Sequence, residues 1–168
     1  MKGGIPGADS SLSRVVSIAI APSDQKIIYA AYSQPSWSPV VNGKLFRSID
    51  GGVSWQDISP GLLGVSWASI SCVAIHPENP FKVIVGFRGG GKVKIMVSEG
   101  AGSGPDAWKD CSDGLPASAD VNALCFDSGR TGDLYAATHE GVWKMDETAS
   151  GWKDFNGNLR PVQIGRAS

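Results

Sequence analysis

The chain has 168 residues, 42% hydrophobic and 18% charged, which is enough to bury one core of ordinary size as a soluble globular unit. Its formal net charge is -1, with 15 basic and 16 acidic residues spread along the sequence, so it lacks the basic stripe of a nucleic-acid-binding protein. No apolar run approaches the roughly 20 residues that cross a bilayer, and residues 1–13 lack the apolar segment of a secretion signal. With 22 Gly and 10 Pro residues, the composition favours an all-β fold of short strands and many turns.

The first set of predicted elements covers residues 14–59. Two apolar strands, at 15–22 and 26–31, flank a polar turn. A third strand follows at 43–48, and a fourth begins near Trp55 and continues into a polar pair. This order predicts one antiparallel meander of four strands.

The same order of elements recurs over residues 70–113 and again over residues 120–156. The predicted strands are 70–77, 82–86, 92–98 and one beginning near Trp108, then 121–127, 133–137, 141–145 and one beginning near Trp152. Equivalent residues lie roughly 50 to 55 positions apart, the length of one propeller blade. A Gly-rich link follows each unit. The sequence therefore predicts a β-propeller unit of three four-stranded antiparallel blades.

One turn carries a complete motif. The segment Ser48-Ile-Asp-Gly-Gly-Val-Ser-Trp55 matches the Asp box, S-x-D-x-G-x-[ST]-W, at every defined position. On this motif and the strand repeat, the chain resembles the Asp-box (BNR-repeat) propellers of sialidases, xyloglucanases, sortilin-type receptors and photosystem assembly factors.

That resemblance gives the motif a structural role in the turn between the third and fourth strands. It implies that Asp50 accepts backbone N–H groups and that Gly51 and Gly52 permit a positive φ. Trp55 is expected to pack across the hairpin. The second and third units keep the Trp but have lost most of the box.

The opposite end of the blades is the predicted binding surface. In a meander, the turns between the second and third strands lie away from the Asp box, together with the links between blades. This end carries four candidate ligand-binding residues: Trp37, Trp67, Arg88 and Lys92. Flat rings beside polar side chains are typical of surfaces that bind sugars or peptides. The alternative for the two Trp residues is that they cap the core.

No catalytic residue, metal site or cofactor is predicted. A glycosidase needs two carboxyl groups across the scissile bond, and Asp120 and Glu140 are the nearest candidates. The Arg and Tyr residues do not reproduce the arginine triad and Tyr nucleophile that resemblance to sialidases would require. The leading hypothesis is a non-catalytic binding or assembly module that contacts a glycan, a peptide or a partner protein. The alternative is a glycosidase-like hydrolase whose cleft forms between assembled blades.

The cysteines carry no metal or redox signature. Cys72, Cys111 and Cys125 form no CxxC pair and no metal-ligand spacing with His76 or His139, so they are expected to be buried free thiols. His76 is expected to be a hydrogen-bonding turn residue. The sequence does not fix a cellular compartment, although the family resemblance implies an extracellular or periplasmic one.

Three blades predict an assembly. Closed propellers usually have about 4 to 8 blades, so three leave two apolar sheet faces open. Two copies could close a six-bladed ring, another blade-bearing chain could supply the missing blades, or the sequence could be part of a longer propeller. We favour the homodimer because twofold assemblies dominate among oligomers.

Overall fold

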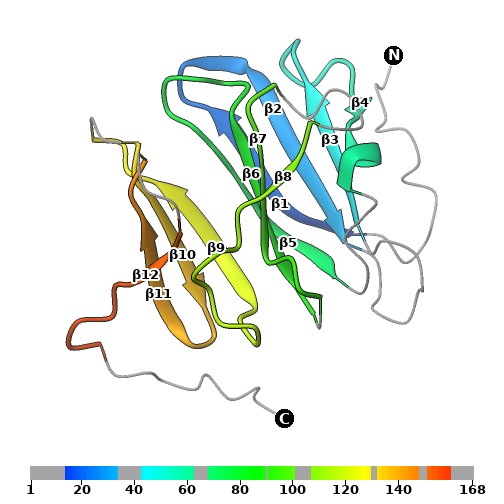
Figure 1. The fold of residues 1–168 in the computed structure, drawn as a ribbon. Helices are drawn as coiled ribbons and strands as arrows, with labels where there is room; N and C mark the ends of the chain where they lie inside the picture. The colour runs from blue at the N-terminus through cyan, green and yellow to red at the C-terminus, as the bar shows by residue number, and fades with distance from the viewer. Residues whose placement is uncertain are drawn as a thin grey trace.

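The computed structural model describes residues 14–33, 43–62, 68–89, 91–100, 107–129, 132–147 and 151–159. These residues form three separate four-stranded sheets (Figure 1), each an antiparallel meander in chain order. Blade 1 contains β1 (Arg14–Ala21), β2 (Asp24–Ser33), β3 (Gly43–Ser48) and β4 (Gln56–Asp57). Blade 2 contains β5 (Ser69–Ile75), β6 (Val83–Arg88), β7 (Ile95–Ser98) and β8 (Lys109–Asp110). Blade 3 contains β9 (Val121–Phe126), β10 (Leu134–Thr138), β11 (Gly141–Met145) and β12 (Lys153–Asp154).

Helical structure is confined to one turn in the described ranges. The 3-10 helix η1 (Ser59–Leu62) directly follows β4 in the first link between blades. None of the helical structure in these ranges has the length and apolar character that a membrane crossing requires.

The strand predictions hold closely, with one correction. The third strands of blades 1 and 3 have the predicted bounds, 43–48 and 141–145. The sequence predicts that the third strand of blade 2 begins at Lys92, but it begins at Ile95. Gly89, directly after β6, has φ 109°, and Lys92 lies in a bend, so the turn between β6 and β7 takes up residues that the pattern assigned to the strand.

Blades 1 and 2 pack face to face. Along β1, alternate side chains point to opposite faces, and Ser17 and Ala19 point toward blade 2. The N–H of Val73 in blade 2 donates to the Ser17 hydroxyl at 3.2 Å. The buried residues of this first seam are Ala21, Ile27, Tyr29, Ala31, Leu45, Ile58, Leu62, Ala68, Ile70, Val73, Ile75, Val83, Val85, Phe87, Met96 and Trp108.

Tyr29 joins the two blades at the first seam. Its hydroxyl donates to the carbonyl of Pro80, in the turn between β5 and β6, at 3.1 Å. Burial raises the pKa of Tyr29 to about 12, so the hydroxyl remains protonated and keeps its role as a donor.

Blades 2 and 3 form a second seam with a smaller buried core. Its residues are Cys72, Ile84, Ile95, Val121, Leu134, Ala136 and Trp152. Gly86 of blade 2 lies close against blade 3, because a Cβ atom there would lie 2.7 Å from Val121 Cγ1, and it would also lie 2.6 Å from Cys72 Sγ in its own blade. Glycine therefore sets the spacing of the second seam.

The link after blade 2 is held against blade 3. The indole N–H of Trp152 donates to the carbonyl of Cys111 at 2.7 Å, and its backbone N–H donates to the carbonyl of Asp113 at 2.8 Å. Gly114 has φ +88°, and a Cβ atom there would lie 2.3 Å from the carbonyl oxygen of Trp152. The Trp that marks the third repeat thus anchors blade 3 to the chain that leads into it.

Candidate functional site

The two ends of the blades are distinguished by their turns. The box end carries the turns between first and second and between third and fourth strands. The loop end carries the turns between second and third strands and the links between blades. Of the predicted binding residues, Trp37 and Trp67 fall outside the described residues. Arg88, the last residue of β6, and Lys92 are both exposed.

The loop end contains a third cation that the sequence did not suggest. Lys94 is buried, and its ammonium donates to the carbonyl of Gly89 at 3.5 Å. Gly89 lies between Arg88 and Lys92 in the turn between β6 and β7, so three basic residues meet around this turn. Nothing in the residue pattern separates a buried Lys from an exposed one at the start of a strand.

Side chains from blade 3 and its link connect the loop ends of blades 2 and 3. Asp120 accepts the N–H of Gly89 at 2.8 Å, and the N–H of Asp120 donates to His139 Nδ1 at 3.1 Å. His139 Nε2 lies 3.5 Å from Glu140, which also accepts the hydroxyl of Ser118. The structure therefore brings Asp120 and Glu140 into one network. Their described contacts are with the protein itself.

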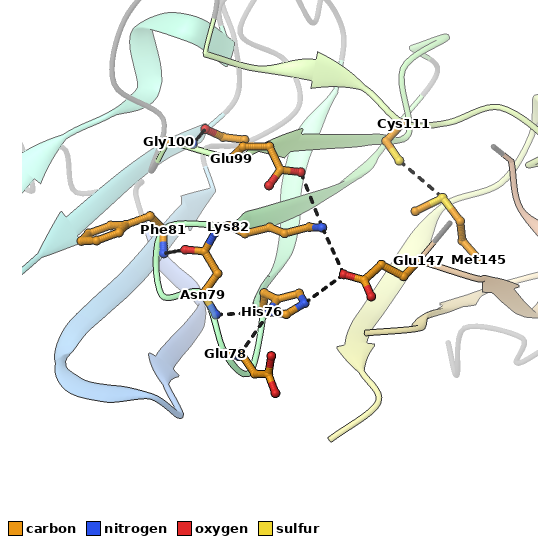
Figure 2. Close-up of polar contacts among 11 residues, drawn as sticks. His76, Glu78, Asn79, Phe81, Lys82, Glu99, Gly100, Cys111, Met145 and Glu147 are labelled. Atoms are coloured by element: carbon orange, nitrogen blue, oxygen red, sulfur yellow. Dashed lines mark hydrogen bonds and ion pairs between the residues drawn. The ribbon is translucent and has the colours of Figure 1, made fainter. Parts of the chain in front are cut away.

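At the box end, a cavity of about 280 Å³ opens between blades 2 and 3. Its lining includes Lys82, Glu99, Cys111, Met145 and Glu147. Figure 2 shows the ammonium of Lys82 between two carboxylates, 3.6 Å from Glu99 and 3.9 Å from Glu147. The sequence did not predict this cavity, because Lys82, Glu99 and Glu147 come from three separate turns.

His76 completes this ion-pair chain, and its ring orientation is set by backbone contacts. Its Nδ1 accepts the N–H groups of Glu78 and Asn79, both at 3.2 Å, so the proton of the neutral ring is assigned to Nε2. Nε2 faces Glu147 at 3.5 Å (Figure 2). The expectation that His76 is a hydrogen-bonding turn residue is confirmed.

The thiols near the seam are poorly suited to nucleophilic chemistry. Cys72 is buried as expected, but Cys111 is only partly buried and Cys125 is exposed. Cys111 Sγ contacts Met145 Sδ at 3.6 Å. Burial raises the pKa of both Cys72 and Cys111, which disfavours the thiolate that a nucleophile or metal ligand needs. Among the described residues, no group of three or more His, Cys, Asp or Glu side chains could hold a metal ion.

The turn that carries the Asp-box motif is organised by Asp50. One carboxylate oxygen accepts the N–H of Ser54 at 2.9 Å and the hydroxyl of Ser48 at 2.7 Å, and the other accepts the hydroxyl of Ser54. Gly51 and Gly52 have φ values of 74° and 91°. The half-buried Trp55 lies beside the turn, 3.8 Å from where a Cβ of Gly52 would be.

Protonating Asp50 is expected to weaken this turn. Hydrogen bonds, chiefly from Ser54, lower the pKa of Asp50 from 3.8 to about 2. A lowered folded-state pKa contributes stability above the unfolded pKa, and this is lost as the pH falls toward 2. We therefore expect the stability difference between wild type and Asp50→Asn to shrink between about pH 4 and pH 2. Urea unfolding across this range measures it, and a constant difference would contradict the assignment.

A second polar motif, which the sequence analysis did not single out, recurs after every fourth strand. Asp57, Asp110 and Asp154 each accept the backbone N–H of the residue two positions later, at 2.8 to 2.9 Å. Those residues, Ser59, Ser112 and Asn156, in turn accept an N–H from the third strand or the residue before it, at 2.8 to 2.9 Å. We call these two contacts together the strand clasp. The sequence pattern Asp-x-[Ser/Asn], which recurs at these three places, could have predicted the clasp.

Two of the clasp aspartates, Asp57 and Asp154, are held ionised. Burial raises the pKa of Asp57, but hydrogen bonds from Ser59 and Lys44 outweigh it, so the net pKa is lowered. The N–H and side chain of Asn156 lower the pKa of Asp154. On the sheet of blade 3, Lys144 lowers the pKa of Asp146. Each of these carboxyl groups is therefore committed to its anionic form.

Comparison with solved structures establishes the fold. An ancestral GH74 enzyme superposes with a TM-score of 0.58 and 19% identity, over 84% of this chain and 18% of that one. YCF48 from Cyanidioschyzon merolae gives 0.61 and 12%, over 90% and 38%. A structure of YCF48 bound to D1 peptide gives 0.58 and 13%, over 89% and 46%.

These comparisons show the fold of the chain and do not assign it an activity. No protein-family model matches the chain, and no curated protein matches it in sequence. The chain spans less than half the length of each of these three structures. Together with the three antiparallel sheets, they show that the described residues form blades of a β-propeller.

Proposed function

We propose that this chain is a non-catalytic binding or assembly module whose loop end contacts a peptide, a glycan or a partner protein. The observation that carries the proposal is that the carboxylates near the two ends of the second seam contact groups of the protein itself. Asp120 and Glu140 tie turns together at the loop end, and Glu99 and Glu147 flank Lys82 at the box end.

Four carboxyl groups outside the two ends of the second seam are poor candidates for the general acid of a glycosidase. Glycoside hydrolysis requires a general acid whose pKa is raised so that it can donate a proton near neutral pH. Among the described residues, the carboxyl groups whose pKa departs clearly from the ordinary value are Asp50, Asp57, Asp146 and Asp154, and each pKa is lowered. These four groups are therefore poor proton donors.

Two exposed cations at the loop end can pair with a carboxylate of a partner. Arg88 and Lys92 are exposed there beside the buried Lys94, and the two Trp residues predicted at this end would add flat apolar contact area. A peptide or protein segment with a carboxylate beside an apolar side chain would complement such a surface. The fold shared with YCF48, which has been solved with a D1 peptide, is consistent with peptide binding.

Replacing the loop-end aromatics tests the proposal. We expect Trp37→Ala and Trp67→Ala each to weaken binding at least about tenfold, because an aromatic anchor typically contributes about 2 kcal/mol. Calorimetric titration with a D1 peptide and with xyloglucan oligosaccharides measures the effect. Val53→Ala is the matched control, since Val53 is 72% exposed in the Asp50 turn at the opposite end. If both Trp variants bind like wild type, the loop-end assignment fails.

A glycoside hydrolase is the second candidate, supported by the fold shared with GH74 enzymes. In that case the cleft would form between assembled blades. Asp120 and Glu140 are the nearest candidates for its two catalytic carboxyl groups. Hydrolysis of xyloglucan or a sialylated glycan that is lost in Glu140→Gln would establish the enzyme. An extracellular or periplasmic location accompanies either candidate, and fractionation of the host cell tests it.

A further inference from the structure

Blade 1 presents a large apolar face on the side away from blade 2. Three side chains of β1 on this side are exposed: Val15 at 51%, Ile18 at 62% and Ile20 at 54%. Ile20 lies opposite Ile28, and Val15 lies opposite Tyr32, across the β1–β2 ladder. These five residues define the outer face of blade 1. Isolated exposed apolar residues are ordinary, but a contiguous set on one sheet face marks an interaction surface.

Blade 3 presents a different face on the side away from blade 2. Ala123 and Cys125 of β9 are exposed there and lie opposite Ala137 and Tyr135 of β10. The ring of Tyr135 contacts Phe155 edge to face, with centroids 5.4 Å apart. These five residues define the outer face of blade 3. Its centre is made of small side chains, in contrast to the outer face of blade 1.

The outer face of blade 1 repeats a face that is already buried inside the chain. The cross-strand pair Ile20–Ile28 occupies the register position of Ile75–Val83 in blade 2. Ile75 and Val83 are buried against blade 1 in the first seam. The outer face of blade 1 is therefore the kind of face that receives a neighbouring blade.

The outer face of blade 3 repeats the complementary face. The pair Cys125–Tyr135 occupies the register position of Ala19–Tyr29 in blade 1, where Ala19 and Tyr29 pack against blade 2. Ala137 occupies the position of Ala31 in blade 1 and Gly86 in blade 2. A small residue thus recurs at this register position, where the contacts around Gly86 leave no room for a larger side chain.

Charge does not oppose contact at these faces. Lys144 lies beside Tyr135 on the outer face of blade 3, but its ammonium is 2.8 Å from both Asp133 and Asp146. It is neutralised within its own blade, so covering this face would leave no unpaired cation.

We infer that the outer face of blade 3 in one copy docks onto the outer face of blade 1 in a second copy. Because each chain carries both faces, the contact forms twice about a twofold axis and closes a ring of six blades. Each new seam reproduces the packing of the two seams within the chain. The Tyr135 hydroxyl then takes the role of Tyr29, donating to a carbonyl of the β1–β2 turn in the other copy.

Two face variants and their mixture test the inference. Light scattering after gel filtration at micromolar concentration should give twice the 17.6 kDa of one chain for the wild type. Ile18→Glu and Cys125→Glu each place a carboxylate at an exposed position of one face, so each should run as a monomer. Mixing them should restore a dimer, because the intact blade 3 face of one variant meets the intact blade 1 face of the other. Val53→Glu, in the Asp50 turn away from both faces, should leave the wild-type mass unchanged.

Thiol reactivity gives a readout that does not depend on mass. Cys125 should react slowly with a thiol reagent in the wild type, where the second copy covers it, and at least tenfold faster in Ile18→Glu. Circular dichroism and Trp fluorescence establish that the variants remain folded.

Three results would overturn the inference: a folded wild-type monomer, a dimer that survives either Glu substitution, or variants that stay monomeric when mixed. The second result would indicate contact between two like faces, and the first would leave the faces to blades outside this sequence. None of these results bears on loop-end binding, which is measured by titration, so the two proposals fail separately.

Discussion

Trp152→Ala is expected to lower the free energy of unfolding by about 3–5 kcal/mol, the usual cost of deleting a buried Trp side chain. Trp152 is 4% exposed and packs in the core of the second seam. Its indole N–H also satisfies the carbonyl of Cys111 at 2.7 Å, which would lose that donor. For a chain of this length, the loss corresponds to a decrease in Tm of roughly 6–20 °C.

Trp152→Phe separates the two contributions. It keeps most of the buried ring area but removes the hydrogen bond, so we expect a loss of about 1–3 kcal/mol. Trp55→Ala is the matched control, because Trp55 is a half-buried Trp at the equivalent point of blade 1. Urea unfolding followed by circular dichroism compares all three. A loss below about 1 kcal/mol for Trp152→Ala would show that the second seam does not depend on this residue.

Adding one methyl group at Gly86 is expected to destabilise the protein by about 1–3 kcal/mol through overpacking. A Cβ atom there would lie 2.6 Å from Cys72 Sγ and 2.7 Å from Val121 Cγ1, inside van der Waals contact. Elsewhere, Gly→Ala commonly stabilises by about 0.4–1 kcal/mol, because it restricts the unfolded chain. The sign of the effect therefore reports on the spacing of the two blades.

For Gly100→Ala we do not expect a loss of stability. A Cβ atom at Gly100 would have no atom within 4 Å of it, so the stability of this variant should be unchanged or slightly raised. Val121→Ala removes the Cγ1 atom that the added methyl group at Gly86 would approach. The double substitution Gly86→Ala with Val121→Ala should therefore cost less than the sum of the two single ones. Additive losses would show that the methyl group is accommodated by Cys72 instead.

The repeat made most of the fold predictable. Trp55, Trp108 and Trp152 precede the fourth strands, and the predicted third strands match at 43–48 and 141–145. These features follow from alternation and turn composition, which are local in sequence. The predicted start of β7 is wrong because the turn that begins at Gly89, with φ 109°, takes up the residues before Ile95.

The candidate sites were less predictable, since they depend on contacts between blades. His76 and Glu147 belong to different blades and meet only when those blades pack. The same holds for Gly89 and Asp120 at the loop end. Sequence reasoning placed Arg88 and Lys92 at the exposed loop end, while Trp37 and Trp67 remain predictions.

The strand clasp has a consequence for the order of folding. The clasp contacts that reach back to the third strand join residues 14 to 18 positions apart, such as Leu45 with Ser59 and Lys94 with Ser112. The Trp152–Cys111 bond spans 41 positions. Closing a short loop loses less chain entropy than closing a long one. We therefore expect each blade to close on itself before it joins its neighbour, so a chain emerging from the ribosome can complete one blade at a time.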